Sequence, residues 1–129
     1  MALRLALDAN RYVDFCKGIK DAVEPLRRAS EIALPFVVLA ELRAGFRCGR
    51  RSPNNERMLG RFLQSPRVTV LFADEATTHF YAELFAELRH AGTPIPTNDL
   101  WVAALAVQHD LTLLTRDRHF QRLARIPRI

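Results

Sequence analysis

Four acidic residues of this sequence belong to its most apolar segments or stand directly beside them, where buried elements would hold them in place. Asp8 follows the run ALRLAL, and Asp117 comes three residues after the run LTLL. Glu41 and Asp99 belong to apolar segments that are predicted to be helices. Carboxylates held close together in a low dielectric repel one another strongly, so such a cluster persists only when a cation neutralises it.

The chemistry open to such a cluster depends on its oxygen donors. An all-carboxylate site suits Mg²⁺ or Mn²⁺ better than zinc, which prefers nitrogen and sulfur ligands. A divalent ion held there would activate a water molecule and would stabilise negative charge on a phosphoryl group. If the four acids converge, we therefore expect a metal-dependent reaction at a phosphate ester.

Each acid also has a structural interpretation that needs no metal. Asp99 in the first turn of a helix would be stabilised by the helix dipole and would help to cap the helix. Glu41 could form a weak solvated ion pair with Arg43 or Arg47, and Asp117 could be a turn residue. Asp8 is the hardest to explain in this way, because it ends an apolar strand. The remaining acids that fit helix caps or exposed faces are Asp14, Asp74, Glu75, Glu83 and Glu87.

The elements that must position these acids alternate along the chain. Strands are predicted where apolar or β-branched residues run together, and helices where apolar residues recur at helical spacing. We expect Pro25 to interrupt the second helix, Ser52 to cap the fourth, and the last dozen residues to form a short helix or coil with an edge strand. The predicted strands cover 2–7, 31–34, 67–72 and 111–114, and the predicted helices cover 10–17, 20–29, 37–47, 52–65, 74–92 and 99–109.

Strands that alternate with helices indicate a mainly parallel sheet covered on both faces, which is a three-layer α/β/α sandwich. We expect residues 1–129 to form one such domain. Ligands of these sheets bind outside the carboxyl ends of the strands. Asp8 and Asp117 would then share one edge, and the helices that carry Glu41 and Asp99 would bring their acids toward it.

Composition and charge narrow the setting. Hydrophobic residues make up 49% of the 129 residues, which is enough for one ordinary core. The 19 basic residues exceed the 14 acidic ones by five, almost all as arginine. This excess favours a phosphate-bearing partner, although a general bias toward arginine and alanine explains it equally well. Two cysteines, short apolar runs and no signal-peptide pattern predict a cytoplasmic protein without a membrane-spanning segment.

Four short motifs, taken in order, resemble those of the PIN domain family. LDAN at 7–10 resembles the opening strand that ends in Asp-x-Asn, and LAELRAGF at 39–46 resembles the second motif, a helix with a glutamate. NDLWVAALA at 98–106 resembles the third motif, an aspartate before an alanine-rich helix. LLTRDRHF at 113–120 resembles the fourth, Thr-x-Asp-x-x-Phe. The motifs span nearly the whole chain, which in length resembles the VapC toxins of type II toxin–antitoxin pairs.

The resemblance implies a metal-dependent endoribonuclease with Mg²⁺ or Mn²⁺ as its cofactor. Asp8, Glu41, Asp99 and Asp117 match the family's acidic quartet, with Asp8 and Asp99 as the direct metal ligands. Glu41 and Asp117 would hold waters of the ion or a second, weaker ion. The residues that would orient the carboxylates or supply a hydroxyl group near them are Asn10, Asn98 and Thr115.

The same resemblance implies an RNA substrate, a separately encoded antitoxin and a homodimer. Arginines near the acids would contact the RNA backbone, form a solvated basic face, or receive the antitoxin. The mechanism needs no histidine as a base, and His119 is left without a role although it is two residues from Asp117. The candidate RNA-binding residues are Arg43, Arg47, Arg116 and Arg118, and Arg50 continues the helical face of Arg43 and Arg47.

Two other functions fit part of this pattern. A phosphoacceptor or phosphotransfer domain also places an aspartate after its first strand. The run DAN, however, lacks the second aspartate of a dehalogenase-type motif, and no lysine follows the last predicted strand. The main alternative is a non-catalytic PIN-like module that binds RNA or protein. The presence of all four acids favours the enzyme, because a degenerate member would be expected to have lost at least one.

Overall fold

A computed structural model of the protein describes residues 2–49 and 51–129, in which strands and helices alternate. Arg50, which the sequence places on a basic helix face, lies outside the described residues. In chain order the elements are β1 (Arg4–Leu7), α1 (Ala9–Cys16), α2 (Lys20–Arg28), β2 (Glu31–Pro35), α3 (Phe36–Cys48), α4 (Ser52–Leu63), β3 (Val68–Leu71), α5 (Glu75–Ala91), α6 (Thr97–Gln108), β4 (Thr112–Leu114) and the 3-10 helix η1 (Arg118–Arg122).

The four strands form one sheet in the order β3-β2-β1-β4, and every pair of neighbours is parallel. The first strand therefore lies in the middle, beside the last, with Leu7 opposite Leu114. The chain end pairs with the outer side of β4, where Leu113 N–H donates to the carbonyl of Pro127 (2.8 Å) and Ile129 N–H donates to the carbonyl of Leu113 (3.0 Å). The expected edge strand is thus present as a short bridged segment.

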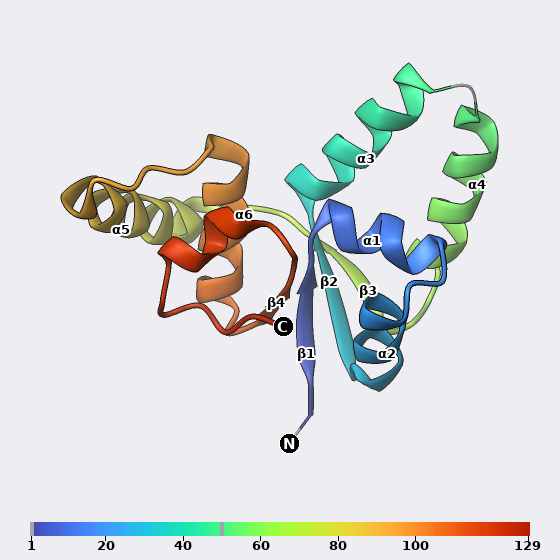
Figure 1. Cartoon of the computed structure of the whole chain (residues 1–129), viewed down its shortest axis with the longest axis horizontal. Coiled ribbons are helices and arrows are strands. Elements are labelled where there is room, and N and C mark those ends of the chain that lie inside the picture. The colour runs from blue at the N-terminus through green and yellow to red at the C-terminus, as the bar shows by residue number, and fades with distance from the viewer. Residues whose placement is uncertain (1, 50) are drawn as a thin grey trace.

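Helices cover both faces of the sheet, which confirms the predicted three-layer α/β/α fold with a parallel sheet. Figure 1 shows α1, α2 and α4 on one side and α5 and α6 on the other. Helix α3 follows β2 without a loop and rises from the carboxyl edge of the sheet. This edge is where the chain leaves β1, β2 and β4, so it collects the residues that follow those three strands.

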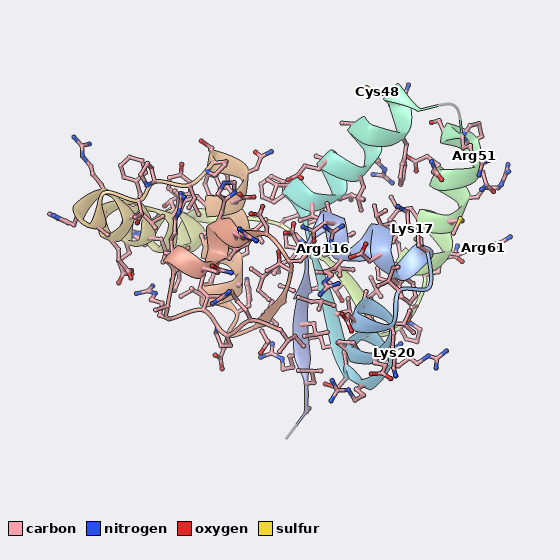
Figure 2. The ribbon with its side chains drawn as sticks, viewed as in Figure 1. Lys17, Lys20, Cys48, Arg51, Arg61 and Arg116 are labelled. Carbon is pink, nitrogen blue, oxygen red and sulfur yellow. The ribbon has the colours of Figure 1, made fainter. Side chains whose placement is uncertain are left out.

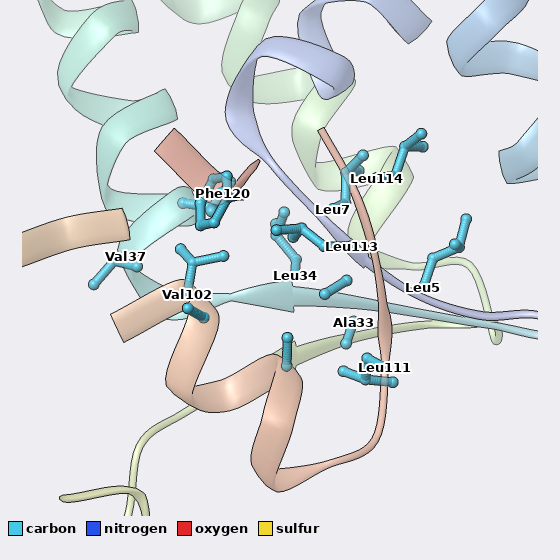
Figure 3. Close-up of a cluster of buried hydrophobic side chains, with 14 of the residues drawn as sticks. Leu5, Leu7, Ala33, Leu34, Val37, Val102, Leu111, Leu113, Leu114 and Phe120 are labelled. Atoms are coloured by element: carbon cyan, nitrogen blue, oxygen red, sulfur yellow. The ribbon is translucent and has the colours of Figure 1, made fainter. Parts of the chain in front are cut away.

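The core explains why the strands have nearly continuous apolar sequences. Strands buried on both faces need apolar residues at every position, and Leu5, Leu7 and Leu34 are all fully buried. Figure 3 shows these side chains in one cluster with Val102 of α6 and Phe120 of η1. In residues 2–49 and 51–129, no helix combines the length and the apolar character that crossing a lipid bilayer requires.

Local sequence signals set both ends of α5, whereas two predicted signals elsewhere need correction. Asp74 caps α5 through a capping box with Thr77, and Gly92 ends the same helix at a left-handed φ of 70°, as glycine allows. The interruption predicted at Pro25 is wrong, because α2 runs through this buried residue and packing offsets the missing hydrogen bond. The cap predicted at Ser52 is also wrong, because Arg51 takes the N-cap position and Ser52 already belongs to the helix.

Candidate active site

Asp8 stands at the centre of the carboxyl edge, between the end of β1 and the start of α1. Its carboxylate is buried, with only 6% of the residue exposed. The Thr115 hydroxyl donates to Oδ2 of Asp8 (2.7 Å), and the Ala9 amide donates to Oδ1 (2.8 Å). Thr115 reaches Asp8 because β4 lies directly beside β1 in the sheet. The two hydrogen bonds fix the carboxylate in one orientation.

Asp117 and Asp99 meet at the same edge through a histidine. The Asp117 amide donates to the Thr115 hydroxyl oxygen (3.0 Å), and Oδ1 of Asp117 accepts from the His119 amide (2.9 Å). Nδ1 of His119 lies 2.8 Å from Oδ2 of Asp99 and 3.1 Å from Oδ1 of Asp117. A single chain of hydrogen bonds therefore starts at Asp8, passes through Thr115, Asp117 and His119, and ends at Asp99.

Burial and mutual repulsion raise the pKa of three of the four acids. Loss of hydration raises the pKa of Asp8 most, the Thr115 and Ala9 hydrogen bonds lower it, and the Asp117 charge raises it again. Loss of hydration also raises the pKa of Asp99, against the lowering effect of its His119 hydrogen bond, and the charges of Asp117 and Asp8 add to the rise. These acids thus lie close enough to disfavour one another's ionised forms.

Glu41 joins this group from α3. Partial desolvation raises its pKa, and the negative charges of Asp8, Asp99 and Asp117 raise it further. The residue is exposed overall. Glu41 thus lies within electrostatic reach of the other three acids.

The donor set of this edge fits a divalent cation. One ligand atom each from Asp99, Asp117 and His119 lie within 4.8 Å of one another. Asp8 and Glu41 add carboxylates that interact electrostatically with this group. Anionic oxygens that raise one another's pKa are stabilised by a cation, and divalent metals are the common solution.

The three residues predicted to orient the carboxylates, Thr115, Asn10 and Asn98, differ in their contacts. Thr115 bonds to Asp8 as described. Asn10 is half-buried in the first turn of α1, and its buried amide oxygen has no hydrogen-bond partner in the described part of the chain. Asn10 and Glu41 line one hollow of about 400 Å³ between α1 and α3, so Asn10 lies beside one of the four acids. Asn98 is exposed at the start of α6, and its orienting role stays a prediction.

Two of the four candidate RNA-binding arginines are engaged by acids of this chain. Arg43 pairs with Glu56 of α4 (3.2 Å) rather than with Glu41. Arg116 makes a fork to Asp14 of α1, with Nε at 2.8 Å from Oδ2 and Nη2 at 3.3 Å from Oδ1. Figure 2 shows Arg116 beside α1. Arg47 and Arg118 are exposed.

Asp14 was expected on an exposed helix face, and this expectation is wrong. The residue is buried, with 7% exposed, and it accepts hydrogen bonds from both Arg11 and Arg116. These contacts, with the Arg116 hydrogen bond and charge as the main causes, hold the pKa of Asp14 below its usual value. The pair ties the loop between Thr115 and Asp117 to the helix that follows Asp8.

We expect Arg116→Ala to lower the melting temperature by roughly 2–4 °C and to slow any reaction at the acidic edge. The variant removes the fork that holds the Thr115–Asp117 loop against α1, while Asp14 keeps Arg11 as a partner. Thermal unfolding and a rate measurement test both parts. Arg28→Ala is the matched control, since Arg28 is an exposed arginine in the last turn of α2, and an equal loss in both variants would contradict a specific role of the fork.

We expect the metal-free protein to lose stability as the pH rises above the ordinary carboxyl range of about 4 toward neutral pH. Asp8, Glu41 and Asp99 have raised pKa values, so the native chain binds more protons than the unfolded chain in this range. Their stabilising effect is complete below the ordinary carboxyl pKa and is lost as the pH rises through the raised values. Thermal unfolding in EDTA at several pH values measures the slope.

Divalent ions give the control for this pH dependence. Mg²⁺ or Mn²⁺ binds the ionised acids, so either ion should raise the melting temperature more at about pH 7 than at about pH 5. Asp14 has the opposite pH dependence. Because its pKa is lowered, its contribution to stability is present at neutral pH and is lost only as the pH falls into the acid range. Equal stabilisation by the ion at both pH values would contradict binding at these carboxylates.

The comparisons with known proteins cover nearly the whole chain. The PIN domain family matches residues 5–126. Ribonuclease VapC4 from Mycobacterium tuberculosis is 34% identical over 90 residues, which is 70% of this chain and 69% of that protein. Ribonuclease VapC2 from Rickettsia felis is 32% identical over 102 residues, or 78% of this chain and 75% of that protein. The crystal structure of Rickettsia felis VapBC2 bound to a promoter DNA fragment superposes with a TM-score of 0.87 at 27% identity and covers 98% of both chains.

Proposed function

This chain belongs to the PIN domain family, and we propose that it is a metal-dependent endoribonuclease, the toxin of a VapBC-type toxin–antitoxin pair. In this proposal residues 1–129 form a single PIN domain. The observation that carries it is the cluster at the carboxyl edge of the sheet, where Asp99, Asp117 and His119 offer ligand atoms within 4.8 Å of one another and the Thr115 hydroxyl joins Asp8 to Asp117. The similarity to proteins named ribonuclease VapC supports RNA as the substrate.

The positions of the four acids suggest a different role for each in binding the ion and its waters. Asp8 and Asp99 are the proposed ligands of Mg²⁺ or Mn²⁺, and the contact of Asp117 with the group around Asp99 makes it a third candidate. Glu41, which is exposed, would hold a water of the ion or a second, weaker ion. When bound, the ion supplies an activated water and offsets charge on the scissile phosphate.

The neighbouring residues hold these acids in the geometry that the reaction needs. Thr115 donates to Asp8 and accepts from the Asp117 amide, so one hydroxyl fixes two acids relative to each other. Arg116 is occupied by Asp14, and we therefore assign it to positioning the loop. Contact with the RNA backbone is left to Arg47 and Arg118, which are exposed and form no ion pair with an acid among the described residues.

A surface next to the acids supports the proposed antitoxin. A hollow of about 360 Å³ is lined by Tyr12, Phe46 and Met58, with Lys17 and Arg51 also in its wall. Figure 2 shows Lys17 and Arg51 on the side of α1 and α4. Phe46 also lines the hollow beside the acids, so the two adjoin. A partner segment with apolar and acidic side chains would fit there. The VapBC2 complex among the structural relatives is the reason to expect a partner at all. The homodimer stays a prediction.

The first test is cleavage of a labelled small-RNA pool by the purified chain in Mg²⁺, in Mn²⁺ and in EDTA. We expect cutting in either ion and none in EDTA, because the proposed acids need the ion to act. An Asp8→Asn variant serves as the control for contaminating nucleases. The fragments produced would begin to identify the target RNA.

Two other outcomes of this experiment would contradict parts of the proposal. RNA binding without cleavage in either ion would favour the non-catalytic PIN-like module. Cleavage that persists in EDTA and in Asp8→Asn would contradict the assignment of the site.

A further inference from the structure

The imidazole of His119 lies between two acids of the site, and the proposed reaction gives it no task. Its Nδ1 atom is 2.8 Å from Oδ2 of Asp99 and 3.1 Å from Oδ1 of Asp117. The ring is partly open to solvent, with 39% of its side chain exposed. The three side chains come from α6, from the loop after β4 and from η1, so the fold brings them together from separate elements.

These spacings match those of metal ligands. Neighbouring ligands of an octahedral ion at about 2.1 Å lie about 3 Å apart, close to both distances from Nδ1. The ring is also held in place, because the His119 amide donates to Asp117 and the next residue, Phe120, is fully buried. Little rearrangement is needed for Nδ1 and the two carboxylates to face one ion.

We propose that His119 supplies a nitrogen ligand to the ion held at Asp99 and Asp117, so that the site prefers a transition-metal ion such as Mn²⁺ over Mg²⁺. The inference rests on the metal site of the proposed function and adds a ligand to it. Imidazole nitrogen is a good ligand for transition-metal ions, whereas Mg²⁺ is bound through oxygen. A purely carboxylate site would lack this basis for preference.

Ligation assigns a definite tautomer to the ring. Nδ1 must offer its lone pair, so the proton of the neutral ring is carried by Nε2. The side chain is partly exposed, which lets Nε2–H donate to water. In the absence of the ion Nδ1 is free to carry the proton and donate to Asp99, which accounts for the short contact.

Pulsed electron paramagnetic resonance of the Mn²⁺-loaded protein, labelled with ¹⁵N-histidine, tests the contact directly. We expect a ¹⁵N hyperfine coupling in the wild type that is lost in His119→Gln. His90→Gln is the matched control, because His90 is an exposed histidine in the last turn of α5, and the coupling should persist there. A wild-type spectrum without nitrogen coupling would overturn the proposal.

Calorimetric titrations with Mn²⁺ and with Mg²⁺ separate a ligand from a residue that only positions the carboxylates. We expect His119→Gln to weaken Mn²⁺ binding roughly 10- to 100-fold and to change Mg²⁺ binding much less. Equal weakening of both ions would mean that His119 acts only through hydrogen bonds, and it would overturn the preference. Neither measurement uses RNA, so a protein that binds Mn²⁺ through His119 but does not cleave RNA would refute the proposed function alone.

Discussion

We expect the Asp99→Asn variant to cleave RNA at least roughly 100-fold more slowly than the wild type, a loss of about 2.7 kcal/mol in transition-state stabilisation. The same variant should unfold at a higher temperature in EDTA. Asparagine preserves the shape of the side chain but removes one of the charges that raise the pKa of Glu41. Weaker repulsion among the remaining carboxylates stabilises the metal-free fold. The loss of one carboxylate ligand weakens binding of the ion and therefore removes the activity.

The opposite signs of the two effects make the result specific. A variant that lost activity by misfolding would show a lower melting temperature, and Asp99→Asn should show the reverse. The matched control is Asp21→Asn, because Asp21 is an exposed acid in the first turn of α2, and cleavage should stay within about twofold of the wild type. More than a tenth of the wild-type rate in Asp99→Asn would argue against a role of Asp99 as a ligand.

The acidic edge could be predicted because it depends on topology more than on side-chain detail. Apolar runs identified the strands, and a parallel sheet necessarily places the residues after β1 and β4 at the same edge. Asp8 and Asp117 follow from this rule directly. Glu41 and Asp99 required the family resemblance in addition, because a helix position alone does not say which way an acid points.

The parts that sequence did not predict are contacts between distant side chains. Asp14 lies three residues after Arg11, as on an ordinary exposed helix face, yet its main partner Arg116 is 102 residues away. The sequence leaves His119 without a role, because the four histidines form no pair at a spacing typical of metal ligands. The sequence did contain a signal that His119 lies near Asp117. The backbone amide two residues after an aspartate often donates a hydrogen bond to that aspartate's carboxylate, as the His119 amide does here.

Phe120→Ala should destabilise the folded chain by about 3–5 kcal/mol, the range for removing a large aromatic ring from a core. Phe120 is fully buried and belongs to the main hydrophobic cluster, as Figure 3 shows. It is also the anchor of η1, the short helix that begins directly after Asp117 and carries His119. Chemical denaturation followed by circular dichroism would measure the free energy of unfolding.

The loss should also reach the site, because Phe120 is the buried residue of η1. We expect weaker Mn²⁺ binding by Phe120→Ala even at temperatures where the variant is folded, and a smaller cost, below about 1.5 kcal/mol, for Phe120→Leu. Phe85→Ala is the control, since Phe85 is 49% exposed. Unchanged Mn²⁺ binding in a folded Phe120→Ala protein would mean that hydrogen bonds alone position Asp117 and His119. A parallel loss of stability and binding would show that one buried ring supports both the core and the chemistry.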